Sequence, residues 1–371
     1  MSGKLLKTVL CAAALTALVG GACARTVTDD NGDQVEVPER IERTVVTNIL
    51  PLASTAAAFA GDATEVVGMH PASMSASTAG LLPSIAPKAL KAKTGFIQGA
   101  NLNVESLLAL SPDVVLVNAP DRRMLERVRS AGLTAFGISP VKWNYDVVDT
   151  FDGWISALAE LWPERSERAD WLKGEMHRVA GLVEERVKDI PEAERLSVLF
   201  VVRSDPRQIV VSGKRFFGES WAARAGARNA ASGITAENAN AAVSMESIYA
   251  WNPDVVILTN FTPLAPSDLA AGRDDNRDWS HVKAVQEGRV YKMPLGIYRT
   301  FTPAGDAPMT LLWLAKTLYP ERFSDIDLER EMSRYYEKGF GARLSRETIA
   351  GSLAPSAAGA KNASTNVRSG R

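Results

Sequence analysis

The chain has 371 residues, of which 46% are apolar, and its formal net charge is −1. This length and apolar content allow two hydrophobic cores. Because Lys and Arg are dispersed and form no basic stripe, nucleic acid is not an expected partner.

The N-terminus has the pattern of an export signal. Lys4 and Lys7 precede an apolar run over residues 8–19, and the small residues Ala22-Cys23-Ala24 follow it. This arrangement predicts a signal peptide over residues 1–24. The apolar run is too short to span a bilayer permanently.

Two processing routes fit this N-terminus. In one, the chain is cleaved before Arg25; in the other, Cys23 is retained and acylated. The segment Gly20-Gly21-Ala22 lacks the Leu that usually lies three residues before a lipidated Cys, which favours cleavage before Arg25. The exported protein then contains no cysteine, so we expect neither a thiol nucleophile nor a cysteine metal site.

Residues 25–163 are predicted to form a first lobe. Asn31-Gly32 lies between alternating apolar and polar residues, which is a strong hairpin signal. Buried strands are expected over residues 45–48 and 65–69, with helices between the strands. This alternation is typical of an α/β unit.

One stretch of sequence occurs twice, over residues 103–118 and 244–259. Both copies contain E-S-x-x-A-x-x-P-D-V-V, which predicts a short helix ended by Pro, a turn at Asp and an apolar strand. Uninterrupted apolar strands belong to parallel sheets that helices cover on both faces. Because the copies are a lobe's length apart, we expect two Rossmann-like α/β lobes with parallel sheets.

Residues 164–190 are predicted to form one long, rigid helix between the lobes. The stretch contains no Pro, and its apolar residues recur on one stripe. About 26 helical residues make a rod of roughly 39 Å. Residues 191–345 resume the alternation of strands and helices as a second lobe. Residues 346–371 are expected to be a disordered tail, because their Ala/Ser/Gly/Asn-rich end lacks apolar periodicity.

The sequence lacks the common enzyme motifs, so we expect no enzyme. There is no G-x-G-x-x-G after the first strand and no G-x-x-x-x-G-K-[ST]. Residues 218–222 approach a nucleophile elbow, but they end in Ala and do not follow a strand. Among the three histidines, His70 follows a strand end, where open α/β sheets bind ligands. Metal sites gather several His and carboxylates, so His70 is the single candidate metal ligand and no bare-ion site is expected.

Arginines and aromatic residues follow predicted strands in both lobes. A cleft with arginine donors and aromatic walls suits a bulky anionic ligand. The candidate ligand-binding residues, besides His70, are Arg122, Arg123, Arg203, Tyr298, Arg299, Trp143, Phe217 and Trp221.

From Arg25 to about Phe340 the chain resembles the class III periplasmic substrate-binding proteins of ABC importers, which serve ferric siderophores, cobalamin and haem. The resemblance rests on four parts of the sequence: the N-terminal segment over residues 25–46, the two repeat units, W-S-H-V-K-A-V-Q-E-G-R-V-Y at 279–291 and L-L-W-L-A-K-T-L-Y-P-E-R-F at 311–323. It implies two lobes joined by one long helix, with a ligand cleft between them.

The resemblance also implies a function and partners. A monomer in the periplasm would capture an iron–siderophore or similar metal chelate, without a cofactor of its own, and deliver it to a permease dimer with its ATPase. Family members dock through one glutamate of each lobe onto permease arginines, and the matching positions are Glu105 and Glu246.

Alternative ligands and one alternative class stay open. Residues 50–54, together with Met69 and Met74 around His70, resemble receptors for nickel or cobalt chelates, and haem or cobalamin are further candidates. A periplasmic chelatase or lyase on the same fold is the hypothesis of another class. It would need an acid or base near the metal, and His70 alone could serve.

Overall fold

The computed structural model describes residues 24–238, 241–275 and 277–355. The predicted signal peptide lies outside the described residues except for Ala24, which begins the first strand. Residues 356–371 of the predicted tail lie outside them as well.

The first lobe is built on a four-stranded parallel sheet, as the apolar strands predict. Its strand order is β4 (Glu65–Met69), β3 (Arg43–Val46), β7 (Val114–Asn118) and β8 (Ala135–Ile138). A hairpin of β1 (Ala24–Thr28) and β2 (Gln34–Pro38) precedes it, and Asn31-Gly32 lies in the turn. The carboxylate of Asp29 in this hairpin accepts a hydrogen bond of 3.1 Å from the amide of Gly137 in β8.

Helices cover both faces of this sheet because its strands alternate between two apolar clusters. Val115 and Val117 pack with residues of α4 (Val104–Leu108) and α5 (Arg122–Ser130). Leu116 packs on the other face with residues of α1 (Leu52–Ala60) and α6 (Val147–Leu161). The remaining elements of this lobe include α2 (Pro71–Ala79), α3 (Leu82–Ile85), the 3₁₀ helix η1 (Pro87–Lys91), β5 (Ile97–Gln98) and β6 (Asn101–Leu102).

The sheet of the second lobe is mixed, which corrects the predicted parallel sheet. Its order is β12 (Ala241–Val243), β10 (Gln208–Val211), β9 (Ser197–Asp205), β13 (Val255–Leu258) and β14 (Val290–Lys292), and β11 (Arg228–Asn229) also pairs with β9. Strands β9, β13 and β14 are parallel, whereas β10 is antiparallel to β9. Only Pro206 and Arg207 separate β9 from β10, and so short a connection allows a hairpin but no parallel crossover.

The helices of the second lobe also cover both faces of its sheet. One face packs against α8 (Phe217–Arg224) and α12 (Ala307–Leu318), and the other against α9 (Met245–Trp251), α10 (Pro266–Ala270) and α11 (Lys283–Gln286). The chain continues with α13 (Leu328–Phe340) and α14 (Arg346–Leu353).

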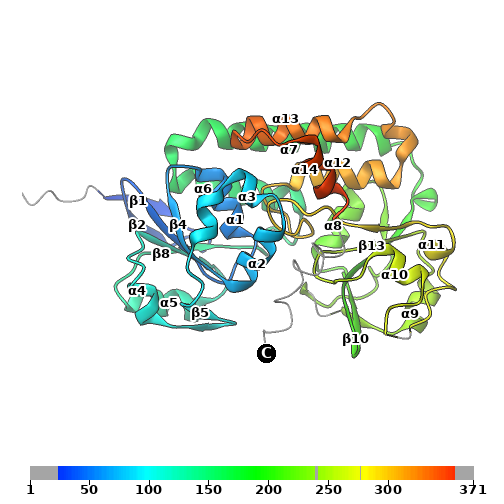
Figure 1. Cartoon of the computed structure of the whole chain (residues 1–371), viewed down its shortest axis with the longest axis horizontal. Helices are drawn as coiled ribbons and strands as arrows, with labels where there is room; N and C mark the ends of the chain where they lie inside the picture. Colours follow the sequence, from blue (N-terminus) through cyan, green and yellow to red (C-terminus); the bar gives the residue numbers. More distant parts are fainter. Residues whose placement is uncertain (1–23, 239–240, 276, 356–371) are drawn as a thin grey trace, which may run out of the picture.

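A single long helix joins the lobes, as predicted. Helix α7 (Ser166–Val187) has 22 residues and is therefore about 33 Å long. It packs on α6, α12 and α13, and Figure 1 shows it running along the top of both lobes. One apolar cluster extends from Leu116 in the first lobe through Met176 of α7 to Phe200 in the second, so the lobes share a core.

Helix α14 corrects the prediction of a disordered tail from residue 346. Ser345 caps this helix, because its hydroxyl accepts a hydrogen bond of 3.1 Å from the amide of Thr348. Ile349 is buried, and the Ser352 hydroxyl donates to the Leu295 carbonyl at 2.9 Å. Packing against the second lobe therefore orders a segment whose own apolar periodicity is weak.

Within the part of the chain that the structure describes, no helix is both long enough and apolar enough to cross a membrane.

Candidate functional site

A cleft with a volume of about 770 Å³ lies between the lobes. The first lobe contributes residues that follow the carboxyl ends of β7 and β8, where α/β sheets bind ligands. The second lobe contributes the segment between β10 and α8 and the segment before β12. The lining residues are Asn118, Pro120, Pro140, Val141, Asn144, Tyr145, Lys214, Arg215, Thr235, Glu237 and Asn238.

Tyr145 connects the two sides of the cleft. Its hydroxyl donates a hydrogen bond of 3.0 Å to Oδ1 of Asn238, and its ring packs edge-on against Phe217 with centroids 5.3 Å apart. Tyr145 and the preceding Asn144 have φ of 63° and 50°. Positive φ is strained for a bulky residue and is concentrated at functional sites. Burial, and then the charge of Glu237, raises the pKa of the Tyr145 phenol, which favours the neutral, donating form.

Asp146, next in the chain, holds the second lobe against this edge of the cleft. One of its oxygens caps α6 by accepting from the amides of Val148 and Asp149. The other accepts from the Ser220 hydroxyl at 3.0 Å and from the Arg224 guanidinium at 3.0 Å. The position of Tyr145 is therefore fixed by contacts with both lobes.

Two cations of the second lobe, Lys214 and Arg215, are exposed at the cleft. The Lys214 amide donates to the carbonyl of Ile234 at 2.7 Å, so the two cleft segments of this lobe lie side by side. Gly213 permits this approach, because a Cβ there would lie 2.5 Å from the Ile234 carbonyl oxygen. The Arg215 guanidinium forms an ion pair with Glu237.

Asn118 offers an acceptor at the cleft. Its backbone amide donates a hydrogen bond of 3.2 Å to Oδ1 of Asn48, whereas its side-chain Oδ1 has no hydrogen-bond partner among the described residues. A buried amide oxygen without a donor is costly, so this atom is suited to a donor from a ligand.

The predicted aromatic residues lie behind the cleft or beside it. Phe217 is buried against Tyr145 and so supports the wall without lining it. Trp221 is fully buried, and its indole donates to the Phe301 carbonyl at 2.7 Å. Trp143 is half-buried with its ring packed over Gly153, where a Cβ would clash with it.

The predicted arginines are dispersed and do not line the cleft. Arg122 and Arg123 are exposed at the start of α5, and Arg122 pairs with Asp33 at 3.2 Å. In β9, Arg203 pairs with Asp205 at 3.4 Å. Their contact with a ligand stays a prediction.

Tyr298 and Arg299 are fully buried in the second lobe. The Arg299 guanidinium donates to the Tyr298 hydroxyl at 2.7 Å and lies 4.8 Å from the centre of the Phe261 ring. Burial raises the pKa of Tyr298. This pair is structural in the geometry observed, and a ligand contact by either residue stays a prediction.

His70 serves as the N-cap of α2. Its Nδ1 accepts from the Ala72 amide at 3.0 Å, and Nε2 donates to the Gly99 carbonyl at 3.3 Å. Burial lowers the pKa of His70, which favours this neutral tautomer. Both ring nitrogens are thus engaged, and the described residues contain no cluster of three or more His, Cys, Asp or Glu side chains suited to a metal ion.

The two predicted docking glutamates occupy equivalent places in the lobes. Glu105 is exposed in the first turn of α4, and Glu246 is exposed in the first turn of α9. In Figure 1 these helices lie at the bottom of the two lobes, on the side away from α7. A hydrogen bond from Ser244 lowers the pKa of Glu246, so its carboxylate is ionised. Docking itself stays a prediction.

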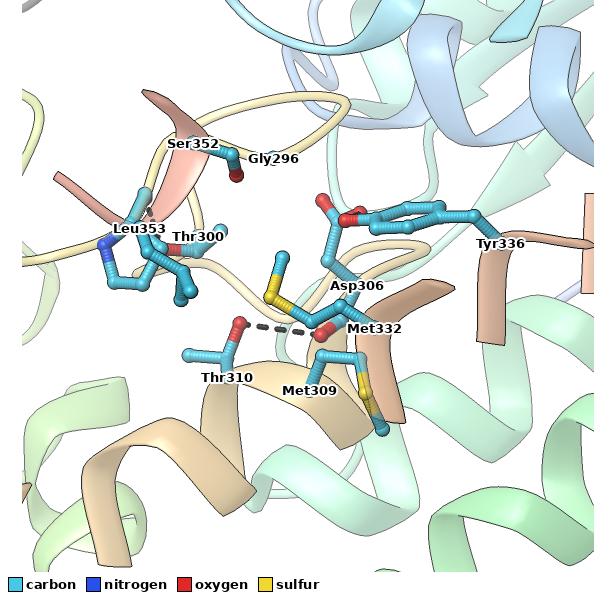
Figure 2. A pocket seen from close by; sticks show the side chains of 10 residues that line it. Gly296, Thr300, Asp306, Met309, Thr310, Met332, Tyr336, Ser352 and Leu353 are labelled. Atoms are coloured by element: carbon cyan, nitrogen blue, oxygen red, sulfur yellow. Dashed lines mark hydrogen bonds between the residues drawn. The ribbon is translucent and has the colours of Figure 1, made fainter. Parts of the chain in front are cut away.

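A second, much smaller cavity of about 10 Å³ lies inside the second lobe (Figure 2). Asp306 lines it, accepting from the Ile297 amide at 2.9 Å and from the Tyr336 hydroxyl at 2.7 Å. Burial raises the pKa of Asp306 to about 7. The space is comparable to one water molecule, so it is no site for a larger ligand.

Sequence reasoning missed Tyr145, Lys214, Arg215, Glu237 and Asn238. One signal was available, since Gly213-Lys214-Arg215 lies one residue after the strand that ends at Val211. The place of Glu237 depends on how its segment pairs with Arg215, and no local pattern encodes that.

Two α/β lobes, one connecting helix and a cleft lined from both lobes define a two-lobed ligand-binding protein. A family model described as periplasmic binding protein matches residues 53–295. The chain therefore belongs to this family, in the class III group that serves ABC importers, as the resemblance predicts.

Individual relatives cover most of the chain. The molybdate-binding protein MolA of Haemophilus influenzae is 26% identical over 355 residues, which are 90% of this chain and 96% of that protein. YvrC of Bacillus subtilis, named an uncharacterized ABC transporter substrate-binding lipoprotein, is 26% identical over 64% of this chain and 72% of its own.

Solved structures agree with this fold. A periplasmic solute binding protein from Veillonella parvula has a TM-score of 0.77 at 25% identity, covering 89% of this chain and 97% of that one. MolA bound to molybdate has a TM-score of 0.72 at 24% identity, covering 86% and 99%.

Proposed function

We propose that this periplasmic binding component of an ABC importer captures an anionic metal chelate, such as a ferric siderophore, in the cleft between its lobes. The observation that carries the proposal is the joint exposure of Lys214 and Arg215 in a cleft of about 770 Å³. Cationic donors suit anionic oxygens. The volume lies within the range of about 300–1,000 Å³ of pockets for drug-sized ligands.

The wall opposite the cations suits such a ligand as well. Tyr145 lines this wall, and Asn118 offers an acceptor without a hydrogen-bond partner among the described residues. Because Asp146 and Asn238 hold this wall in place, the ligand meets a largely preformed surface. A preformed site loses little affinity, because few side chains and loops have to become ordered when the ligand binds.

A small oxyanion is the second candidate. MolA, which is 26% identical over 90% of this chain, is named for binding molybdate. Lys214 and Arg215 would serve an oxyanion equally well, but a tetrahedral anion would leave most of the cleft to water. Nickel and cobalt chelates, haem and cobalamin are further ligands to test.

A binding panel with matched variants tests the proposal. The panel contains molybdate, ferric tris(catecholate) and tris(hydroxamate) complexes, nickel and cobalt chelates, haem, cobalamin and the uncomplexed metals. Arg215→Ala or Lys214→Ala should weaken binding of the preferred anion roughly ten- to a hundredfold, since a hydrogen bond to a charged group contributes about 1.5–3 kcal/mol. Isothermal titration calorimetry measures the affinities.

Control variants separate this cleft from other positions. Lys188→Ala removes an exposed cation at the C-terminal end of α7 and should leave affinity unchanged. Arg123→Ala and Arg203→Ala test the arginines predicted from sequence. Tight binding that is indifferent to Lys214 and Arg215, or binding of a bare metal ion alone, would contradict the proposed site.

A further inference from the structure

The cation best placed for an anionic ligand already has an anionic partner from the protein. The Arg215 guanidinium pairs with the carboxylate of Glu237, and both side chains line the cleft. Their exposed fractions are 61% and 48%, so the pair lies at the open surface of the cleft.

The backbone, and not a chance side-chain rotamer, brings Glu237 to this position. Arg215 and Glu237 face each other across an isolated β-bridge. The amide of Asn238 donates to the Arg215 carbonyl at 3.2 Å, next to the bond from Lys214 to Ile234. Glu237 is therefore presented to Arg215 by two segments that are hydrogen-bonded to each other.

The first lobe fixes the same segment from the other side. The Tyr145 hydroxyl donates to the side chain of Asn238, the residue directly after Glu237. The Glu237 charge also acts on Tyr145, since it contributes to raising the pKa of that phenol. A carboxylate, a guanidinium and a neutral phenol thus converge on one part of the cleft.

An exposed ion pair of this kind is weak and easily replaced. Water screens both charges, and holding two long side chains together costs conformational entropy. The planar guanidinium donates in pairs to a carboxylate or a similar anion. A ligand with two or more anionic oxygens at this place would compete with Glu237 for the same donors.

We propose that Glu237 is a built-in counter-anion, which occupies Arg215 in the ligand-free protein and is displaced by the anionic group of the ligand. This role of Glu237 rests on the proposed function and adds a rule for which anions the cleft selects. A weak, singly charged anion does not displace Glu237, whereas a multiply charged chelate or oxyanion does. The cleft thereby discriminates against the abundant small anions of its surroundings.

Glu237→Gln tests this role, with molybdate and a ferric tris(catecholate) complex as probes. The variant should bind the preferred probe up to about fivefold more tightly, the factor that corresponds to the upper worth of an exposed pair. It should also gain measurable binding of acetate, a singly charged anion that does not displace Glu237 in the wild type. Glu185→Gln is the matched control, because it neutralises an exposed carboxylate of α7 that also pairs with a cation.

A double-variant cycle separates competition from simple charge repulsion. If Glu237 acts through Arg215, Glu237→Gln should change affinity less than twofold in an Arg215→Ala background. An equal gain in both backgrounds would show repulsion alone and overturn the proposal. Weaker binding by Glu237→Gln would show that Glu237 contacts the ligand, which also overturns it.

These outcomes also distinguish failure here from failure of the proposed function. Arg215-dependent binding without a gain in Glu237→Gln contradicts the counter-anion alone. Binding of neither probe, or binding that does not depend on Arg215, contradicts the anion site on which both rest. Equal melting temperatures of the variants would confirm that the fold is not involved.

Discussion

Asp306 is a buried carboxyl group at a point where the second lobe touches the first. Its carboxylate accepts a hydrogen bond from the amide of Ile297. The neighbouring residues Gly296 and Gly305 contact the first lobe. The Gly296 carbonyl accepts from the Leu81 amide at 2.8 Å, and the Gly305 amide donates to the Thr55 hydroxyl at 3.2 Å. A Cβ at Gly296 would collide with the carboxyl group of Asp306, so only glycine allows the loop to pass this close to Asp306.

The titration of Asp306 should make stability depend on pH. Burial raises its folded-state pKa from 3.8 to about 7. The folded protein therefore binds a proton more tightly than the unfolded chain does. Protonated Asp306 therefore contributes up to about 4 kcal/mol to the free energy of unfolding. This contribution is fully present below about pH 4 and is lost as the pH rises through about 7.

Asp306→Asn should remove this dependence. Its amide oxygen can accept from Ile297, and its NH₂ can donate to Tyr336, so the packing is retained. Denaturant unfolding of both proteins from pH 4 to 8 should show the wild type losing stability relative to the variant as pH rises. The titratable neighbours Tyr335 and Tyr336 have pKa values raised well above the ordinary range and stay neutral there. A pH-independent difference would contradict this assignment.

Which side chains reach the cleft could be predicted only in part. Strand ends predict the loops after β7 and β8, because the carboxyl ends of parallel strands lie at one edge of a sheet. The sequence predicts Trp143 there and not Tyr145, since the positive φ of Asn144 and Tyr145 that turns the chain leaves no clear trace in sequence. Arg299 is likewise predicted to contact the ligand because it follows a strand. In the structure it is buried against Phe261, and that contact depends on the tertiary fold.

At the scale of elements, α7 is tied to α13 by a buried acidic side chain. Glu175 of α7 is buried, and it accepts from Arg178 at 2.6 Å and from Arg334 of α13. Burial raises the pKa of Glu175, but the hydrogen bonds from Arg178 and Arg334 outweigh it, so the pKa is below its ordinary value. The carboxylate is charged and joins two helices.

Glu175→Ala should destabilise the protein by roughly 1–3 kcal/mol. The change removes one of the two carboxylates that Arg178 and Arg334 share, and breaking a buried pair is costly. The loss is limited because both arginines are partly exposed and keep their ion pairs with Glu331. Glu185→Ala, at an exposed position of the same helix, is the control and should change little. Urea unfolding at neutral pH measures both. Equal midpoints for the two variants would show that this contact contributes nothing.

Long periodic helices were the elements best predicted from sequence. The predicted interlobe helix over residues 164–190 differs from α7 by a few residues at each end. The hairpin of β9 and β10 and the helix α14 were not recognised. Both depend on short-range geometry or on packing that apolar periodicity does not report.

At the scale of the whole molecule, Glu105 and Glu246 allow a test of docking. Both are exposed, and their helices, α4 and α9, lie on the side away from α7 (Figure 1). If they bind permease arginines, the double variant Glu105→Ala/Glu246→Ala should abolish uptake while ligand affinity and melting temperature stay nearly unchanged. Uptake of the preferred ligand by cells carrying each variant measures this.

The matched control removes two exposed glutamates from the opposite side. Glu167→Ala/Glu185→Ala on α7 should transport normally. If the Glu105/Glu246 variant still imports, these glutamates act only as favourable charges at helix N-termini, each worth roughly 0.3–1 kcal/mol.

The core that the two lobes share affects how a bound ligand is released. Leu116, Met176 and Phe200 belong to one apolar cluster, so separating the lobes would expose packed surface to water. We therefore expect that the lobes rarely separate spontaneously and that a bound ligand is not released in this way. If Glu105 and Glu246 dock on the permease as we predict, the transporter holds one carboxylate of each lobe and can supply the work that separates the lobes.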